Sequence, residues 1–347
     1  MRRAVLILGL LVCSQAHAQK DPVSRSWNQP VAPFRILGNI YYVGASDVTA
    51  YLIATPKGHI VIDGGFEETG PMIMSNIEKL GFEVASVRII LSSHAHYDHA
   101  GGLAAIKYAT GATLMAGAGD VPLLTSGGHN DPQFGDTLLF PPVVPDQALH
   151  DGDRIALGGS ILFAHLTPGH TPGCVTWTMT VRERGKAYNV VFVGSPSLPS
   201  QYRLVGNARY PNVIADYRHT YEVLKALSCD VFLTQHGSLF DLAGKSARLQ
   251  KGEKPNPFID PEGYGRFVSS TEETFEATVR QQTAAAELAA DRAPVQAVPA
   301  ASTSAPALAP VPVPVASPAP IAPPPVVKPG VVPRAVTPPP VKPPRAG

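Results

Sequence analysis

A histidine-rich segment directly after an apolar run constrains the fold of this 347-residue chain more than any other feature. The segment reads Ser92-Ser93-His94-Ala95-His96-Tyr97-Asp98-His99-Ala100-Gly101-Gly102. The run before it, Val87–Ser92, contains a β-branched stretch and predicts a strand, whereas Gly102–Ala109 has the apolar spacing of a helix. Four potential metal ligands therefore lie on a strand-to-helix loop, where a site on an α/β scaffold is expected.

The spacing of these side chains allows two ions to be held next to each other. His94 and His96 are two residues apart, so in an extended chain their imidazoles point to the same side and can converge on one ion. Asp98 and His99 fall where the chain turns into the helix, and they can face a second ion. The glycines that follow are expected to let the backbone turn sharply beneath the metals.

Two further histidines have a comparable setting. His170 lies in the turn-rich segment Pro168-Gly169-His170-Thr171-Pro172-Gly173, and His236 follows the apolar run Val231–Gln235. Ligands at the ends of strands and in the following loops are typical of sites built on sheets. The other histidines of the body lack such a setting and are interpreted as structural or solvated: His59, His129, His150, His165 and His219.

The body between about Arg35 and Gln282 alternates short apolar runs with amphipathic stretches, which predicts an α/β fold of layered sheets and helices in one domain. Predicted strands are Arg35–Val43, Tyr51–Ala54, His59–Asp63, Val87–Ser92, Ile161–Leu166, Val175–Val181, Val190–Gly194 and Val231–Thr234. Predicted helices are Glu67–Leu80, Gly102–Ala109, Ile214–Leu227 and Glu272–Gln282.

The two ends of the chain differ from this body. Residues 1–18 contain two arginines, a short apolar run and the triplet Ala16-His17-Ala18, which is the layout of a secretory signal and predicts a periplasmic protein. The run is too short to span a membrane. Lipidation at Cys13 is the alternative, although Val12 is bulkier than that processing prefers. The catalytic domain is predicted to be 19–291.

Residues 292–347 are rich in Pro, Ala and Val and predict a disordered, extended tail. Of the 36 prolines, 18 lie between Pro294 and Pro344, and proline removes backbone donors and favours the polyproline conformation. The tail contains basic residues and no acid, so a weak association with an anionic envelope surface is a second interpretation of it.

The charge of the body disfavours a nucleic-acid-binding protein. The formal charge of the chain is +1, from 28 basic and 27 acidic groups. Six basic residues lie in the N-terminal segment and the tail, which leaves 22 against 27, or about −5, in between. Phosphate contacts need clustered Lys and Arg, and the body contains no such cluster.

The histidine motif, taken with several other segments, resembles the metallo-β-lactamase superfamily and, within it, the third subclass of the metallo-β-lactamases. The other segments are Trp27–Pro30, Val61–Gly65, Ser126–Gly128, Tyr202–Asn207, Arg209–Pro211 and Ala226–Asp230. The resemblance implies a four-layer αβ/βα sandwich with a single catalytic domain. It also implies two zinc ions, one held by His94, His96 and His170 and the other by Asp98, His99 and His236. Asp63 would orient a ligand histidine from behind the site, or would be an ordinary strand-end aspartate.

One sequence position distinguishes the third β-lactamase subclass from the other hydrolases of this superfamily. Related lactonases and glyoxalase II enzymes carry a metal-bridging aspartate after a strand and a glycine, and the first β-lactamase subclass has a cysteine ligand there. Here the corresponding run is Val191-Phe192-Val193-Gly194-Ser195-Pro196-Ser197. A serine hydroxyl does not readily lose its proton and is a poor zinc ligand. By resemblance, Ser195 and Ser197 would instead donate hydrogen bonds to a substrate carboxylate.

The resemblance therefore implies a zinc β-lactamase that hydrolyses penicillins, cephalosporins and carbapenems with a metal-bridging hydroxide and so confers antibiotic resistance. Asp98 would hold the second zinc and orient the hydroxide, and the β-lactam would be the small-molecule partner. The alternatives are another dinuclear zinc hydrolase of the same fold, acting on a lactone, thioester or phosphodiester, and a non-enzymatic envelope-binding protein.

The cysteines depart from the subclass pattern. Only Cys174 and Cys229 follow the predicted signal, and they could form one disulfide or remain two buried thiols. In well-known members of the subclass the cysteine that matches Cys229 pairs with one on the C-terminal helix, near the position that Tyr264 occupies here. We therefore expect Cys229 to be a free thiol. Cys174 lies four residues after His170 but is not expected to be a ligand.

Overall fold

The computed structural model describes residues 22–292. The chain divides into two units, residues 1–293 and 294–347, and only the first contains described residues. The predicted signal peptide, Cys13, and all of the predicted tail except Arg292 lie outside the described residues, so the proposed domain boundaries stay predictions.

The strands of the described residues form two mixed sheets. The first sheet keeps the order of the sequence: β1 (Phe34–Leu37), β2 (Ile40–Tyr42), β3 (Tyr51–Thr55), β4 (Gly58–Ile62), β5 (Val87–Leu91), β6 (Thr113–Gly117) and β7 (Gln147–Leu149). Its first four strands pair antiparallel and its last four pair parallel. The second sheet has the order β12 (Val231–Thr234), β11 (Lys186–Val193), β10 (Val175–Glu183), β9 (Ser160–Leu166) and β8 (Arg154–Leu157).

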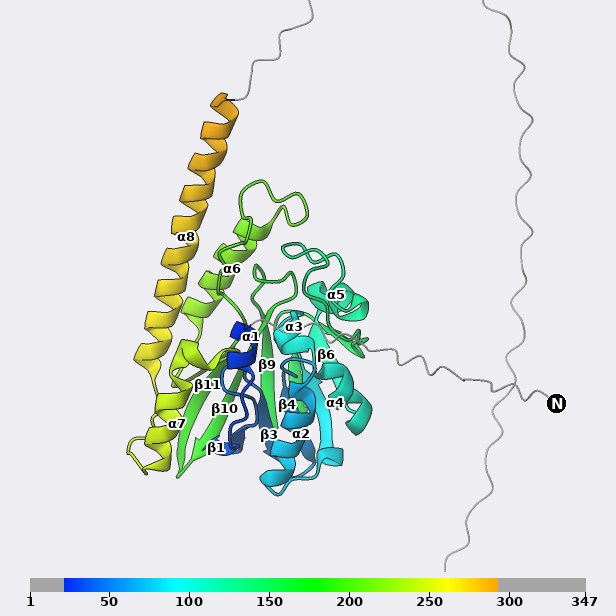
Figure 1. Cartoon of the computed structure of the whole chain (residues 1–347). Coiled ribbons are helices and arrows are strands. Elements are labelled where there is room, and N and C mark those ends of the chain that lie inside the picture. Colours follow the sequence, from blue (N-terminus) through cyan, green and yellow to red (C-terminus); the bar gives the residue numbers. More distant parts are fainter. Residues whose placement is uncertain (1–21, 293–347) are drawn as a thin grey trace, which may run out of the picture. The chain divides into compact units, whose positions relative to one another are not determined.

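Helices cover the outer face of each sheet. Figure 1 shows α2 (Thr69–Lys79) and α4 (Leu103–Thr110) on the side of the first sheet, and α6 (Val213–Ala226) and α8 (Pro261–Arg292) on the side of the second. Shorter helices lie in the connections: α1 (Pro22–Trp27), α3 (Tyr97–Ala100), α5 (Val121–Ser126), α7 (Leu242–Gln250), η1 (Val84–Ser86), η2 (Ala118–Asp120) and η3 (Gly237–Phe240).

The alternation of side chains along the strands explains this layering. In β4, Ile60 and Ile62 belong to the core between the sheets, whereas Val61 between them packs with Ile73 of α2 and Leu103 of α4. Successive side chains of a strand point to opposite faces, so a strand that is apolar at every position needs cover on both sides. The predicted α/β fold of stacked sheets and flanking helices is thus confirmed.

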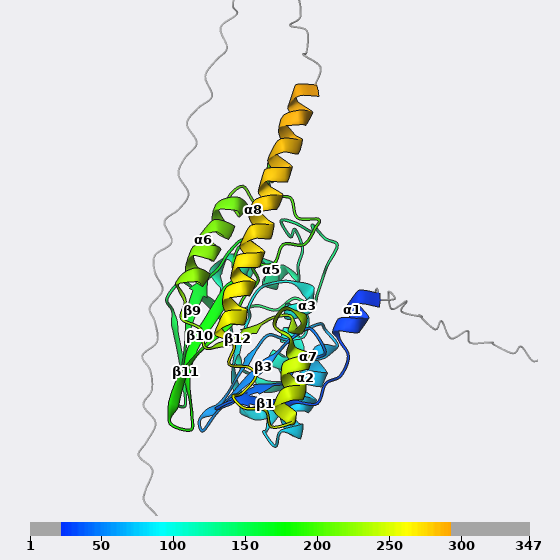
Figure 2. The same ribbon diagram turned by 90° about the vertical axis from the view of Figure 1, so that its left-hand side faces the viewer.

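Several predicted boundaries are wrong. The run Arg35–Val43 forms two strands, β1 and β2, because Gly38 adopts a φ of 55° and turns the chain. Helix α8 extends from Pro261 to Arg292, far beyond the predicted Glu272–Gln282. Its last ten residues, 283–292, are exposed, and Figure 2 shows this end of α8 extending past the rest of the body.

Both cysteines of the described residues are free thiols, as expected for Cys229. Tyr264 is buried at the start of α8, where its hydroxyl donates to the Leu224 carbonyl at 2.7 Å. Its ring meets the edge of Phe232 on β12, with centroids 5.7 Å apart. An aromatic side chain therefore ties α8 to α6 and to the second sheet.

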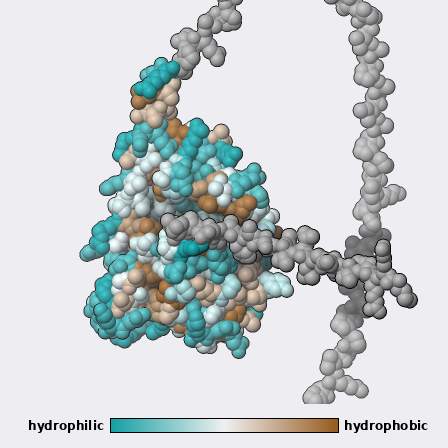
Figure 3. All heavy atoms as spheres, viewed as in Figure 1, coloured by the Kyte–Doolittle hydropathy of each residue, from teal (hydrophilic) through white to brown (hydrophobic). Residues whose placement is uncertain are grey.

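Apolar and hydrophilic residues are mixed on the one face of the body that Figure 3 shows. On the face shown in Figure 3, apolar residues form small separate patches among hydrophilic ones. None of the helices within residues 22–292 combines the length and the apolar character needed to cross a bilayer.

Candidate metal centre

The predicted ligands come from three connections that meet at one end of the two sheets. His94 and His96 follow β5, and Asp98 and His99 lie on the short helix α3. His170 lies in the loop between β9 and β10, and His236 directly follows β12. The structure thus brings together residues that are far apart in the sequence, and all of them are buried or nearly so.

The first cluster consists of His94, His96 and His170, each of which offers one ring nitrogen within 4.8 Å of those of the other two. His96 Nδ1 and His170 Nε2 face each other at 3.0 Å. The ring of His94 is 5.0 Å from that of His96 and 4.8 Å from that of His170, centroid to centroid. This convergence is the one predicted for a first ion.

The second cluster is assembled around Asp98. The compact group of ligand atoms here contains His94, Asp98 and His99. Asp98 Oδ2 lies 3.4 Å from His99 Nε2 and 3.5 Å from His236 Nε2. His236 therefore contacts the second cluster at Asp98. His94 belongs to both compact groups and lies between the two clusters.

Each of four ligand histidines has a partner on its outer side. Such contacts fix the orientation and the tautomer of a ligand imidazole. His94 Nδ1 lies 3.0 Å from the Ser93 hydroxyl, His96 Nε2 3.3 Å from Asp131, His170 Nδ1 2.9 Å from the Ser197 carbonyl, and His236 Nδ1 2.9 Å from Asp47. The second nitrogen of each ring can then face the clusters.

The electrostatics of the site give His94, His170 and Asp98 the protonation states that a metal requires. Burial and the neighbouring histidines lower the pKa of His94 and His170 well below the usual value, so both rings are neutral near pH 7. Burial alone would raise the pKa of Asp98, but His99 and His236 bring it well below the usual value, so it is ionised. A histidine binds a metal ion as the neutral imidazole, and an aspartate binds it as the carboxylate.

His236 lies between two carboxylates. Burial alone would lower its pKa, but hydrogen bonds to Asp47 and Asp98 raise it to about 9. The position therefore favours a positive charge, which either a proton or a metal ion can supply.

Unsatisfied nitrogen atoms show that the residues fit a metal. Within the described residues, both ring nitrogens of the buried His99 make no hydrogen bond. A buried polar atom without a partner costs about 1–3 kcal/mol, so native proteins rarely leave several together. Bound metal would satisfy one nitrogen of the His99 ring, and the two clusters are consistent with a dinuclear site.

The glycines after the motif have a different role from the one predicted. Gly101 and Gly102 both adopt ordinary right-handed helical angles, so they make no sharp turn. A Cβ atom on Gly102 would lie 2.2 Å from the Gly64 carbonyl oxygen. The glycines therefore allow the metal-binding loop to pack directly against the backbone that follows β4.

Asp63 does not bond a ligand histidine directly. It has a φ of 65°, is buried, and accepts a hydrogen bond from the Ser93 amide at 2.7 Å. Ser93 in turn contacts His94, so Asp63 supports the ligand loop one step further away. Burial raises the pKa of Asp63 to about 6.

Ser195 and Ser197 are placed differently at the edge of the site. Ser197 lines the cavity above the clusters, whereas Ser195 is buried and has its hydroxyl 2.8 Å from that of Ser197. The Ser195 amide donates to Cys174 Sγ at 3.0 Å. Burial raises the pKa of Cys174 to about 12, so it is a thiol rather than a thiolate ligand.

The cavity above the clusters has a volume of about 480 Å³ and opens between loops. Its floor contains His96, Asp98, His99, His170 and His236. Its walls are partly apolar and come from Trp27, Phe134, Leu138, Leu198 and Leu239. A polar floor under apolar walls is typical of a small-molecule site.

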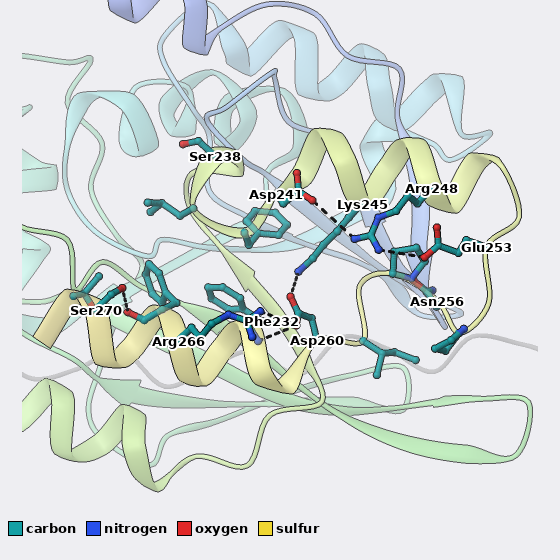
Figure 4. A pocket seen from close by; sticks show the side chains of 18 residues that line it. Phe232, Ser238, Asp241, Lys245, Arg248, Glu253, Asn256, Asp260, Arg266 and Ser270 are labelled. Atoms are coloured by element: carbon teal, nitrogen blue, oxygen red, sulfur yellow. Dashed lines mark hydrogen bonds and ion pairs between the residues drawn. The ribbon is translucent and has the colours of Figure 1, made fainter. Parts of the chain in front are cut away.

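A larger cavity, of about 840 Å³, lies between α7, the start of α8 and η3 (Figure 4). Its basic side chains are paired with carboxylates: Lys245 with Asp260 at 2.8 Å, and Arg248 with Glu253 at 3.2 Å. The compact groups of potential metal ligands in the described residues lie elsewhere. The smaller cavity, which contains these groups, is therefore the candidate active site.

Sequence reasoning missed the carboxylates outside the clusters, Asp47 and Asp131. Asp47 lies in the β2–β3 connection and Asp131 in the loop before β7, and neither belongs to a metal motif. Nothing in the sequence around Asp47 or Asp131 indicates which histidine each of them contacts, so the sequence offers no signal for assigning them.

A known protein family and several curated proteins are similar to this chain. The family model described as "Metallo-beta-lactamase superfamily" matches residues 43–236. A hydroxyacylglutathione hydrolase from Rhodospirillum rubrum is 32% identical over 117 residues, which cover 34% of this chain and 36% of that protein. The chain spans only 36% and 50% of the length of the first two curated relatives that it matches.

Solved structures match over more of the chain. The FEZ-1 metallo-beta-lactamase from Legionella gormanii is 43% identical, with a TM-score of 0.72 over 74% of this chain and 98% of that one. BJP-1, a subclass B3 metallo-beta-lactamase of Bradyrhizobium japonicum, is 42% identical, with a TM-score of 0.70 over 75% and 97%. LRA-12, a class B3 di-zinc metallo-beta-lactamase from an Alaskan soil metagenome, is 34% identical, with a TM-score of 0.69 over 72% and 95%.

Proposed function

Because the chain belongs to the metallo-β-lactamase superfamily, we propose that it is a zinc-dependent β-lactamase of the subclass B3 kind. The observation that carries the proposal is the pair of histidine–aspartate clusters at the floor of a cavity, in a chain whose structural neighbours are B3 enzymes at 34% to 43% identity. The reaction would be hydrolysis of the amide bond of the β-lactam ring.

Two zinc ions would be held by the residues of the clusters. His94, His96 and His170 would bind one ion, and Asp98, His99 and His236 the other. When bound, zinc supplies Lewis acidity and lowers the pKa of a coordinated water to about 7, which provides a nucleophile at neutral pH. No serine or cysteine nucleophile is needed, in keeping with the protonated, buried Cys174.

The chain's own residues orient and enclose the substrate. Ser197 lines the cavity and its hydroxyl can donate to the carboxylate that β-lactams carry next to the ring nitrogen. The hydroxyl of the buried Ser195 lies 2.8 Å from the Ser197 hydroxyl and fixes its position by a hydrogen bond. The apolar walls formed by Trp27, Phe134 and Leu198 exclude water from the rest of the ring system.

A thioester hydrolase is the second candidate function, because a hydroxyacylglutathione hydrolase is among the relatives. The position after β11 favours the β-lactamase. Ser195 stands where a bridging carboxylate is expected for a thioesterase of this fold, and its hydroxyl instead makes a hydrogen bond with that of Ser197.

The decisive experiment compares two substrates with and without a chelator. We expect the purified enzyme to hydrolyse a chromogenic cephalosporin, to lose that activity after dialysis against EDTA, and to regain it with zinc. Turnover of a hydroxyacylglutathione thioester should be at least tenfold weaker. An enzyme that hydrolyses the thioester and not the cephalosporin would establish the second candidate instead.

We also propose that the protein is exported to the periplasm and that its basic tail associates weakly with the envelope. Cleavage after Ala18, found by N-terminal sequencing of the mature protein from a periplasmic extract, tests the first statement. A variant truncated at Arg292 tests the second, because unchanged fractionation between soluble and envelope material contradicts a role for the tail.

A further inference from the structure

Asp120 is a buried carboxylate that lies outside the two clusters and does not line the cavity above them. It ends the short helix η2 after β6 and is 1% exposed. Its three hydrogen-bond partners are all donors: the Ala95 amide at 2.8 Å, the Thr171 hydroxyl at 2.7 Å and the Gly173 amide at 2.7 Å. An ionised carboxylate only accepts hydrogen bonds, so it suits three donors.

These donors belong to two different metal-binding loops. Ala95 is the residue between His94 and His96, and Thr171 directly follows His170. The same oxygen, Oδ2, accepts from Ala95 and from Thr171. One carboxylate therefore joins the loop that carries two ligands of the first cluster to the loop that carries the third.

The backbone around Asp120 is packed so closely that the loops have little freedom to adjust. A Cβ atom on Gly173 would lie 2.1 Å from the Asp120 amide nitrogen, and one on Gly119 would lie 2.4 Å from the Pro172 carbonyl oxygen. A Cβ atom on Gly117 would lie 2.1 Å from the Gly173 carbonyl oxygen. The segment 117–120 and the His170 loop are thus in direct backbone contact.

We propose that Asp120 is a positioning residue for the three-histidine cluster, because it fixes the separation of the loops that carry His94, His96 and His170. The second cluster does not depend on it in the same way, since Asp98 and His99 lie on α3 and His236 follows β12. This inference rests on one part of the proposed function, namely that the clusters bind zinc.

The variant Asp120→Asn tests whether the hydrogen bonds of Asp120 position the two loops. Asparagine has the same shape, but one of its two terminal groups is an NH₂ donor. Whichever way the amide turns, that donor faces at least one of the donors of Ala95, Thr171 and Gly173. Thr171→Val is the milder variant, because it removes one hydrogen bond and leaves the carboxylate and the two amides in place.

The experiment measures zinc affinity at one cluster at a time, by titration of the metal-free protein against a chromophoric chelator. His236→Ala leaves the first cluster intact, and His170→Ala leaves the second. We expect Asp120→Asn to lower zinc affinity about 10–100-fold in the His236→Ala background, the range typical of outer-shell partners. In the His170→Ala background the affinity should change less than about threefold, because the partner of the second cluster is Asp47 rather than Asp120.

Asp146→Asn is the matched control. Asp146 also accepts a backbone hydrogen bond next to β6, from the Leu114 amide at 2.8 Å, but it contacts neither metal loop. It should change the melting temperature without changing zinc affinity at either cluster. Thr171→Val should give a smaller loss than Asp120→Asn at the first cluster, and it serves as the test if Asp120→Asn does not fold.

Equal losses at both clusters would overturn the proposal, because they would show a general structural role. Unchanged first-cluster affinity in Asp120→Asn, or in Thr171→Val if only that variant folds, would overturn it too. The proposed function can survive either result, since the chain would still bind zinc. A chain that binds no zinc at either cluster would overturn both.

Discussion

Asp47 Oδ2 lies 2.9 Å from Nδ1 of His236, a residue 189 positions further along the chain. The other carboxylate oxygen of Asp47 accepts from the Ser238 amide at 2.6 Å, and its carbonyl accepts from the Gly237 amide at 2.7 Å. The Asp47 amide donates to the Trp27 carbonyl at 2.9 Å, and the Trp27 ring meets that of His236. The orientation of His236 is therefore set by the β2–β3 connection and by the segment before β1.

Replacing Asp47 with alanine should weaken zinc binding at the second cluster. The His236 ring would lose the acceptor that holds Nδ1–H, and the loss expected for such a partner is about 10–100-fold in metal affinity. Zinc content after dialysis against a weak chelator measures this, and we expect about one ion per chain instead of two. Glu262→Ala, an exposed carboxylate on α8, is the control and should keep both ions.

Asp131 makes two separable contributions, because its two oxygens have different partners. Oδ1 accepts from the amides of Gln133 and Phe134, both at 2.7 Å, and so shapes the loop. Oδ2 faces His96 Nε2 at 3.3 Å. Asp131→Asn can keep the loop contacts through its amide oxygen, but it presents an NH₂ group to the ring of His96.

We therefore expect Asp131→Asn to lower zinc affinity at the first cluster about tenfold with little change in melting temperature, whereas Asp131→Ala lowers both. Calorimetric titration with zinc and thermal unfolding of the metal-free protein measure the two effects. A melting temperature that falls equally in both variants would show that the side chain serves only the loop.

The residues of the two clusters could be predicted from the sequence because they are concentrated in one motif and at strand ends. His94, His96, Asp98 and His99 are local to one loop, and the sequence around His170 and His236 already indicates strand ends. Asp47, Asp131 and Asp120 could not be assigned to partners, since each acts on a loop brought close only by the stacking of the sheets. Ser195 shows the same limit, because the sequence does not reveal that it lies behind Ser197.

The fold was predictable where a strand is apolar at most positions and uncertain where burial is sparse. The predicted strand Val87–Ser92 differs from β5 by one residue, because four of the five side chains of β5 are buried. The C-terminal end of α8 could not be predicted, since its buried residues are confined to Tyr264–Val279 and the exposed last turns carry no apolar period. The start of α8 does carry an apolar period, at Tyr264, Phe267 and Val268, and the predicted helix Glu272–Gln282 overlooks it.

Removal of metal should destabilise the protein as well as inactivate it. The metal-free site keeps buried histidine nitrogens without hydrogen bonds, and a ligand that binds only the native state adds about 4 kcal/mol at a thousandfold excess over its Kd. We expect the melting temperature to fall by several degrees in EDTA and to recover with zinc but not with magnesium, which prefers oxygen ligands. An unchanged melting temperature would contradict metal binding by the folded chain.

Replacing Ser195 with aspartate tests how this position contributes to specificity. The new carboxylate would stand beside Ser197 and would repel the carboxylate of a β-lactam, so kcat/KM for a cephalosporin should fall by roughly tenfold or more, which corresponds to about 1.4 kcal/mol. Hydrolysis of thioesters or other esters should be retained or rise. Ser195→Ala is the control, because it removes the hydroxyl contact with Ser197 without adding charge. Equal effects of both variants would argue against the electrostatic explanation.

The ion pair between Lys245 and Asp260 predicts a pH-dependent stability. Burial raises the pKa of Asp260, but hydrogen bonds from Lys245 and from the Gly263 amide outweigh this, so the pKa is lower in the folded protein than its usual value. A lowered carboxylate pKa gives stability that is complete above the unfolded pKa of about 3.9 and is lost as the pH falls through the folded pKa. Lys245 is 3% exposed and its Nζ lies 2.8 Å from Asp260, so a buried ammonium group loses its carboxylate partner when Asp260 is replaced.

Asp260→Asn should therefore lower the free energy of unfolding by about 3 kcal/mol at pH 7, the order expected when a buried charge loses its partner. Below about pH 4 the difference between variant and wild type should shrink, because the wild-type carboxyl then becomes protonated as well. Urea unfolding at a series of pH values measures this. Glu262→Gln, at an exposed position two residues away, should leave the whole profile unchanged. A difference that stays constant from pH 7 to pH 3 would mean that Asp260 acts only as an uncharged cap of α8.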